Sequence, residues 1–220
     1  VLPRHPVRSS MARPLREAAA NGGQPSEAVR RLVIASGNPQ KVAEIEAMLA
    51  VAEISVLPQP KGLEIEETGD TYAENARLKA SSVALLTGEW ALADDSGLEV
   101  DALDGRPGLY SARYAPTDSE RIARLLDELG GSLYRGARFV SAMALADLQG
   151  TIRLEGCGLC HGTILTEPKG RGTGYDAIFW VREAGSSYAE MTPHLRARLG
   201  SRGKAARTMA AELRVLFGLT

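Results

Sequence analysis

The sequence lacks the features that mark nucleic-acid-binding and membrane proteins. It has 26 Lys and Arg against 27 Asp and Glu, a formal net charge of −1, so no basic excess attracts nucleic acid or an anionic membrane. No run of about 18 apolar residues occurs, so we expect no membrane-spanning helix. A phosphate-bearing ligand would therefore need a local basic site. With 220 residues, 44% of them apolar, the chain can bury a sizeable core as one large or two-lobed domain.

Cysteine is nearly absent as well. The two cysteines, Cys157 and Cys160, lie in the stretch GCGLCHG as a C-x-x-C pair. A structural zinc site needs about four ligands, and only His161 lies nearby. A redox C-x-x-C normally opens a helix, whereas this pair lies in a glycine-rich run. We predict free thiols, which fit a reducing cytosol and a cytoplasmic location.

Residues 1–30 lack helical and strand periodicity and are rich in Arg, Ala, Pro and Gly. They offer too little apolar bulk to fold, and no continuous apolar segment suits a secretory signal. We predict a disordered N-terminal extension, with Met11 as a candidate start. The Arg-rich, acid-poor composition leaves an organelle transit peptide open as the alternative. Residues 31–220 are then expected to form a single domain.

Apolar periodicity predicts a chain in which helices and strands interleave. Two long strands, 137–147 and 151–165, follow each other without a helix between them. This order predicts a mixed β-sheet flanked by helices, an α/β protein rather than a purely parallel sheet. The other expected strands are 31–36, 53–58, 90–95 and 175–181, and the expected helices are 41–50, 71–88, 118–131 and a terminal region, 192–218, broken around 200–203.

The segment SGNPQK (36–41) lies between a predicted strand and a predicted helix. Backbone amides and the helix dipole attract anions at such a place, and Pro39 suits a first helical turn. Ser36 and Asn38 offer polar side chains and Lys41 offers a cation. The spacing of a Walker loop is absent. On its own, the segment fits either a phosphate site or a plain turn with a surface lysine.

Acidic residues gather ahead of the second predicted helix: Glu64, Glu66, Glu67 and Asp70. They suit a helix start, and Thr71 with Glu74 has the spacing of a capping box. One of the acids could instead ligate a metal, because Mg²⁺ takes one or two carboxylates together with water and phosphate oxygens. Asn75 and Lys79 are four residues apart and can face one site, where Lys79 could hold a phosphate.

Two adjacent acids, Asp94 and Asp95, end an apolar run and precede Ser96 and Gly97. If the strand persists to Asp95, the pleat places the two side chains on opposite faces. Residues at the carboxyl ends of strands in open α/β sheets line ligand crevices, and Gly97 permits a close approach of the backbone. The alternative is a strand end with solvated acids.

Two later segments are ambiguous alone. PKGRGTGYDAIF (168–179) sets three glycines around basic residues before Tyr175 and Asp176, which suits a flat ligand or an unremarkable turn. RARLGSRGKAAR (196–207) is basic, and such runs are usually solvated.

Taken together, in this order and spacing, these segments resemble the inosine triphosphate pyrophosphatase family, the house-cleaning XTP/dITP diphosphatases. The resemblance spans about Arg31 to Leu219. It is carried by ASGNPQKVAEIEAML, EETGDTYAENARLKA, ADDSGLEVDALDGRPGLYSARYA, FVSAMALA, EPKGRGTGYDAIF and YAEM followed by SRGKA.

The resemblance implies an elongated mixed α/β fold with two lobes, a nucleotide in the central cleft and usually a homodimer. It implies Mg²⁺-dependent hydrolysis of a nucleoside triphosphate, such as ITP, dITP or XTP, to monophosphate and pyrophosphate. By position, Glu66 is a Mg²⁺ ligand, with Glu67 as the open alternative, and Asp95 is both metal-associated and the general base. The implied substrate-binding residues are Ser36, Gly37, Asn38, Pro39, Gln40, Lys41, Lys79, Ser96, Thr173, Gly174, Tyr175, Asp176, Arg196, Ser201 and Arg202.

Four positions depart from the family pattern, all in segments that would surround the base. Thr173 stands where an aromatic residue is usual, and Ala177 replaces a proline. Arg196 replaces a lysine and Ser201 a histidine. Two alternatives therefore remain: the same reaction on pyrimidine or modified nucleotides, as in the similarly folded Maf-type pyrophosphatases, and a non-catalytic nucleotide-binding protein.

Overall fold

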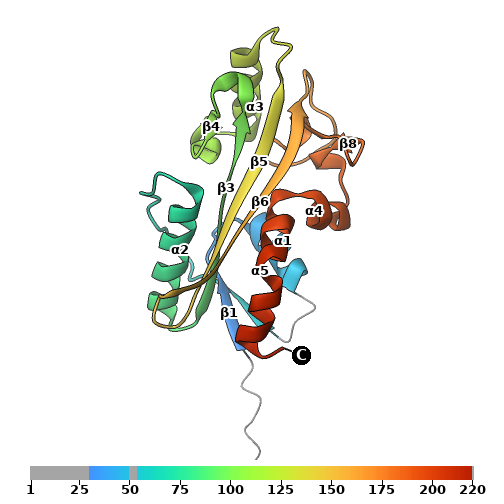
Figure 1. Cartoon of the computed structure of the whole chain (residues 1–220). Helices are drawn as coiled ribbons and strands as arrows, with labels where there is room; N and C mark the ends of the chain where they lie inside the picture. Colours follow the sequence, from blue (N-terminus) through green and yellow to red (C-terminus); the bar gives the residue numbers. More distant parts are fainter. Residues whose placement is uncertain (1–29, 50–53, 220) are drawn as a thin grey trace, which may run out of the picture.

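The computed structural model describes residues 30–49 and 54–219, which form a mixed α/β structure around one eight-stranded sheet (Figure 1). The predicted disordered extension, apart from Arg30, lies outside the described residues. The strands are β1 (Arg30–Ile34), β2 (Ile54–Pro58), β3 (Trp90–Val100), β4 (Pro107–Gly108), β5 (Gly136–Ala146), β6 (Ile152–Ile164), β7 (Phe179–Val181) and β8 (Ser186–Ser187). The helices are α1 (Pro39–Leu49), α2 (Tyr72–Thr87), α3 (Asp118–Leu129), α4 (Pro193–Leu199) and α5 (Ser201–Phe217), with short 3₁₀ turns η1 (Asp101–Leu103), η2 (Ser111–Arg113), η3 (Asp176–Ile178) and η4 (Tyr188–Glu190).

The sheet has the order β2-β1-β3-β5-β6-β7-β8, and β4 pairs separately with β3. The pairs that β1 makes with β2 and β3 are parallel, whereas all later pairs are antiparallel. The prediction of a mixed sheet is thus confirmed. Within the described ranges, no helix is both long and apolar enough to cross a membrane.

Three long strands, β3, β5 and β6, run through the molecule, and separate cores form along them. At one end α2 packs its small buried residues, such as Ala76 and Ala80, on one face of the sheet, while Met209 and Phe217 of α5 pack on the other. Figure 1 shows α2 and α5 on opposite sides of this half. At the other end, α3 and η3 enclose a third core with Leu125 and Ile178. The site described below lies between these two ends.

Local sequence signals explain several boundaries. The predicted capping box forms: Thr71 accepts from the amide of Glu74, and the Glu74 side chain accepts from the amide of Thr71. The terminal helical region is broken as expected, since Gly200 ends α4 and begins α5. A Cβ at Gly203 would lie 1.9 Å from the carbonyl oxygen of Ala197, so only glycine allows the two helices this contact.

Two predicted strands differ in the structure. Residues 175–181 are a strand only from Phe179 onward, because backbone hydrogen bonds from Asp176 to Thr173 and from Ile178 to Tyr175 hold the preceding residues in a 3₁₀ turn. Strand β3 does not end at Asp95 but continues to Val100, because β5 pairs with it along its whole length. The two acids therefore lie in mid-strand, and the reading as a solvated strand end is wrong.

Candidate functional site

One edge of β3 is uncovered in the middle of the sheet. Strand β1 pairs with β3 as far as Leu92, and β4 begins to pair at Leu98. Among the described residues no strand covers positions 93–97 on this side, a stretch that we call the open edge. The carbonyl oxygen of Asp94, which lies in it, accepts instead from Lys79 Nζ at 2.9 Å. A ligand lying over the open edge can reach both faces of β3.

On one face of β3 the Asp94 carboxylate holds two cations. Asp94 is 1% exposed, and its Oδ2 lies 2.9 Å from Lys41 Nζ and 3.2 Å from Arg202 Nη2. Burial alone would raise the pKa of Asp94, but the charges of Arg202 and Lys41 outweigh it and hold the pKa far below its ordinary value. Asp94 is therefore a permanent anion that fixes two basic side chains.

On the other face, Asp95 meets two side chains of α2. Lys79 Nζ lies 3.0 Å from Asp95 Oδ1, and Asn75 donates to Oδ2 at 3.2 Å. The prediction that Asn75 and Lys79 face one site is confirmed. Burial raises the pKa of Asp95, and the charge of Lys79 offsets only part of that rise. Asp95 is thus a more basic carboxylate than an ordinary aspartate.

Glu67, rather than Glu66, lies beside Asp95. Glu67 Oε1 is 3.0 Å from Lys79 Nζ, and its Oε2 is 2.9 Å from Arg113 Nη1, whereas Glu66 is exposed. The sequence left the choice between the two glutamates open, and the structure places only Glu67 in contact with Lys79. Sequence reasoning did not single out Arg113, although it lies in the quoted stretch that ends in LYSARYA.

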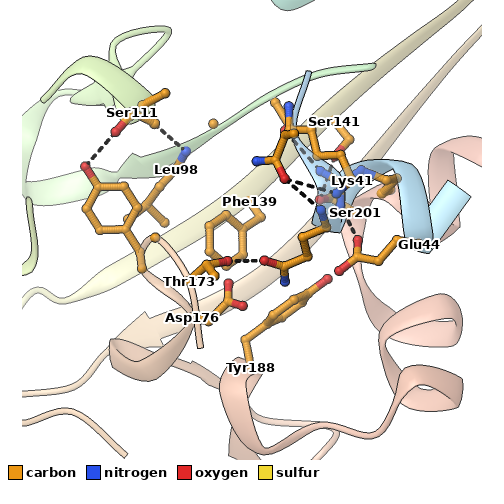
Figure 2. Close-up of a pocket in the computed structure, with 18 of the residues that line it drawn as sticks. Lys41, Glu44, Leu98, Ser111, Phe139, Ser141, Thr173, Asp176, Tyr188 and Ser201 are labelled. Atoms are coloured by element: carbon orange, nitrogen blue, oxygen red, sulfur yellow. Dashed lines mark hydrogen bonds and ion pairs between the residues drawn. The ribbon is translucent and has the colours of Figure 1, made fainter. Parts of the chain in front are cut away.

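A cavity of about 780 Å³ opens on the Asp94 face. Figure 2 shows side chains from α1 (Lys41, Glu44), from β5 (Phe139, Ser141) and from the glycine-rich loop (Thr173) around it. Predicted site residues that line this cavity are Gly37, Asn38, Pro39, Gln40, Lys41, Ser96, Thr173, Gly174, Tyr175, Asp176, Ser201 and Arg202. The predicted residues Ser36, Glu66, Lys79, Asp95 and Arg196 do not line it.

The start of α1 forms the cavity wall nearest the open edge. Asn38 Oδ1 accepts from the amides of Gln40 and Lys41 at 2.9 and 3.2 Å, and Ser36 Oγ accepts from the amide of Asn38 at 3.2 Å. Ser36 therefore shapes the loop from outside the cavity. This arrangement turns the positive end of α1 and the Lys41 ammonium toward the same space.

The far end of the cavity is rich in charge. Arg196 Nη1 lies 3.2 Å from Asp176 Oδ2 and 3.6 Å from Glu44 Oε1, and Glu44 also pairs with Arg202. Burial raises the pKa of Asp176 to about 6, although the charge of Arg196 opposes the rise. Glu44 was not among the predicted residues, but it lies one helical turn after Lys41 and so on the same face of α1.

Two of the departures from the family pattern make hydrogen bonds within the cavity wall. Thr173 donates to Gln40 Oε1, which connects the glycine-rich loop to α1. Ser201 Oγ lies 2.9 Å from Ser141 Oγ in a buried pair. The amide of Gly174 donates to Asp118 Oδ2 at 2.7 Å, which fixes the same loop to α3. Sequence reasoning missed Ser141 and Asp118, whose roles depend on partners far along the chain.

The donor set fits Mg²⁺ held together with a nucleotide. In the described part of the chain no three His, Cys, Asp or Glu side chains gather as a ready metal cage. Glu67 and Asp95 nevertheless converge on one cation, the Lys79 ammonium, which is 3.0 Å from each. Because Mg²⁺ typically takes one or two carboxylates and completes its shell with water and phosphate oxygens, this pair is sufficient.

Comparison with known proteins identifies the family of the chain. The model of the Ham1 family matches residues 32–212. A protein of Nostoc sp. strain PCC 7120, described as a dITP/XTP pyrophosphatase, is 53% identical over 175 residues, which is 79% of this chain and 89% of that protein. The structure is similar to a HAM1 protein from Coxiella burnetii, with 39% identity, a TM-score of 0.76 and coverage of 84% and 98% of the two chains.

A second solved structure, from Mycobacterium abscessus, is described as a nucleoside-triphosphatase or dITP/XTP pyrophosphatase. It has 37% identity and a TM-score of 0.64 and covers 83% of this chain and 98% of its own. These matches confirm the resemblance that the sequence motifs indicated. The chain belongs to the Ham1 family.

Proposed function

We propose that this protein hydrolyses deaminated purine nucleoside triphosphates, such as dITP, XTP and ITP, to the monophosphate and pyrophosphate. The observation that carries the proposal is the open edge of β3, with a cavity large enough for a nucleoside on one face and the cluster of Asp95, Lys79 and Glu67 on the other. The names of the relatives in Nostoc and Mycobacterium abscessus support the choice of substrate.

The phosphates would lie between the start of α1 and the open edge. The amides of α1 and the Lys41 ammonium would bind phosphate oxygens, and Lys79 would bind them from the opposite face. Mg²⁺ held by Glu67 and Asp95 would offset the negative charge that develops on these oxygens. Glu67 replaces Glu66 in this proposal because only Glu67 lies beside Asp95.

Asp95 is the proposed general base. Its carboxylate would take a proton from the water that attacks the α-phosphorus, and burial raises its pKa in the direction that favours this role. Asn75 and Lys79 hold both carboxylate oxygens, so the orientation of Asp95 is fixed before the substrate binds.

The charged end of the cavity would select the base. Arginine can only donate, so Arg202, which lines the cavity, would pair with the O6 of a 6-keto purine and leave a 6-amino group unmatched. Sites reject an analogue strongly when it leaves buried polar groups without partners. Ser96, Thr173, Tyr175, Asp176 and Ser201 complete the proposed pocket for base and sugar.

A second candidate substrate class is favoured by one observation. Thr173 is engaged with Gln40 rather than offering an aromatic surface, and Ser201 is engaged with Ser141. A pocket with less stacking surface suits a smaller pyrimidine base, which supports the alternative of the same reaction on pyrimidine or modified nucleotides.

A substrate panel tests the proposal. Purified protein is assayed with Mg²⁺ for pyrophosphate release from ITP, XTP, dITP, ATP, GTP, UTP, dUTP and dTTP. We expect the 6-keto deaminated purines to be the best substrates. If no nucleotide of the panel releases pyrophosphate, the proposed catalysis is contradicted. If only the pyrimidine nucleotides release it, the second substrate class is the correct one.

We further propose the setting of the enzyme. Residues 31–220 would act as one catalytic domain, the protein would work as a homodimer in the cytoplasm, and Mg²⁺ would be its metal. Size-exclusion chromatography with light scattering tests the dimer, and activity after chelation and return of Mg²⁺ or Mn²⁺ tests the metal.

A further inference from the structure

Arg113 extends the cluster on the Asp95 face beyond the residues assigned so far. It is the last residue of η2, and its Nη1 binds Glu67 Oε2 at 2.9 Å. The other oxygen of Glu67 binds Lys79, which in turn binds Asp95. The four groups thus form one continuous series in the order Asp95, Lys79, Glu67 and Arg113.

The position of this series indicates which part of a substrate it meets. None of its four members lines the cavity proposed for the nucleoside, but neighbours of both ends of the series do: Ser96 beside Asp95 and Ala112 beside Arg113. A nucleotide that leaves the cavity over the open edge can therefore meet both ends of the series, Asp95 and Arg113. Because Asp95 is placed at the α-phosphorus and Arg113 is at the opposite end of the series, Arg113 would meet the leaving pyrophosphate.

The charges in the series also call for an anionic ligand. Without a ligand, the negative charges of the two carboxylates and the positive charges of the two cations cancel. Addition of a divalent cation at Glu67 and Asp95 leaves the cluster with excess positive charge, and it weakens the hold of Glu67 on Arg113 because both compete for the same carboxylate. A pyrophosphate group would restore the balance, and a guanidinium can bind it through two parallel hydrogen bonds.

The contact between Arg113 and Glu67 is not needed to hold the fold. The Arg113 side chain is 53% exposed, and exposed ion pairs contribute only about 0–1 kcal/mol to stability. The guanidinium also lies 5.8 Å from the centre of the exposed Tyr110 ring, which limits its directions without burying it. The Arg113 guanidinium is therefore accessible to a ligand and is already held beside the cluster.

We propose that Arg113 is a further substrate-binding residue, which binds the β- and γ-phosphates and the pyrophosphate product. The inference deepens the proposed function and rests on it for the identity of the leaving group. It makes Arg113 part of the same site as Lys79, although the two come from different elements, η2 and α2.

The experiment measures product binding instead of turnover alone. Arg113→Ala and the wild-type protein are titrated by calorimetry with pyrophosphate and, separately, with inosine monophosphate, each with Mg²⁺. Arg106→Ala is the matched control, because Arg106 is similarly exposed (57%) and pairs with Glu128 rather than with the cluster. Arg113→Gln is measured in parallel, and thermal denaturation shows that each variant is folded.

We expect Arg113→Ala and Arg113→Gln to weaken pyrophosphate binding roughly tenfold or more, the size of a lost charge-assisted hydrogen bond, and to change monophosphate binding less than about twofold. Arg106→Ala should change neither. The inference would be overturned if the Arg113 variants bound pyrophosphate as the wild type does, or if their affinities for pyrophosphate and monophosphate fell equally. It would also be overturned if the wild type showed no measurable pyrophosphate binding. A wild type that binds pyrophosphate through Arg113 but hydrolyses no nucleotide would instead contradict the proposed function.

Discussion

Asp94 and Asp95 are consecutive residues whose carboxylates lie on opposite faces of β3 and bind different lysines. Asp94 holds Lys41 at 2.9 Å, and Asp95 holds Lys79 at 3.0 Å. Two adjacent acids would repel each other in a shared pocket, but here each has its own cation. The two acids therefore make separate sets of contacts, and substitution of each residue can separate their effects.

Asp95→Asn should abolish most turnover while nucleotide binding remains. The amide keeps the shape but cannot take a proton, and general-base catalysis typically contributes about 10²–10⁴-fold. We expect kcat for ITP to fall by that factor while the affinity for inosine monophosphate changes little. Asp104→Asn is the control, because Asp104 is exposed and its backbone has a φ of 52°, which asparagine tolerates. An Asp95→Asn enzyme with normal kcat would falsify the role of Asp95 as the base.

Asp94→Asn should act mainly on stability. It leaves Lys41 and Arg202 without their buried counter-charge, and removal of one partner of a buried pair costs about 3–5 kcal/mol. Urea denaturation should show a loss of this size, and Lys41→Met in the same chain should recover part of it. A variant as stable as the wild type would show that Asp94 is not the anion that holds these cations.

The stabilisation from Asp94 should also depend on pH in one direction. Its pKa in the folded protein lies far below the ordinary value, so its contribution is complete above about pH 4, the unfolded pKa, and disappears as the pH falls toward the folded pKa. Wild-type protein should therefore lose stability in acid more steeply than Asp94→Asn.

The contribution of Asp176 to stability should depend on pH in the opposite direction. Burial raises its pKa to about 6, so between about pH 4 and 6 the folded state binds more protons than the unfolded state. The contribution of Asp176 to stability is then greatest at low pH and falls as the pH rises through 6. Asp176→Asn removes this change, so the stability of the variant relative to wild type should increase by up to about 3 kcal/mol from pH 4 to pH 7. Equal differences at both pH values would contradict the raised pKa.

Gly97→Ala should disturb the site through the backbone. A Cβ at Gly97 would lie 2.4 Å from the carbonyl oxygen of Gly108, 2.7 Å from Tyr72 Oη and 2.9 Å from Ser111 Oγ. Since β4 and η2 must move away, we expect a loss of about 1–3 kcal/mol in stability and a higher KM. Gly131→Ala is the matched control, because a Cβ there meets nothing within 4 Å. If both variants behave like the wild type, the close packing of β4 on Gly97 is not important for the site.

The sequence predicted those parts of the site that depend on local geometry. The capping box at Thr71, the shared face of Asn75 and Lys79 and the opposite faces of Asp94 and Asp95 all follow from helical or strand periods within a few residues. The order of elements and the mixed sheet followed from the same periods. Boundaries were predicted less well, because the extent of β3 is set by its pairing with β5 and not by its own residues.

The missed residues depend on contacts between distant segments. Glu67 meets Arg113 across 46 positions, and Ser141 meets Ser201 across 60. Ser141 lies in an apolar run that predicts only a buried strand, so no local signal indicates its hydroxyl partner. The 3₁₀ turn at Asp176 was missed for a related reason, since the apolar residues that follow it have a strand-like composition.

The open edge of β3 has a consequence for how ligand binding changes the sheet. Uncovered sheet edges usually invite pairing with another chain, and proteins cover or interrupt them. Here the backbone groups of Asp94 and Ser96 turn toward the gap between β1 and β4, because alternate residues of a strand direct them to the same side. A bound phosphate chain would occupy the place of an absent strand. A bound nucleotide would then satisfy the backbone groups that a neighbouring strand would otherwise bind. Slower hydrogen exchange of the Ser96 amide would therefore detect nucleotide binding before any bond is broken.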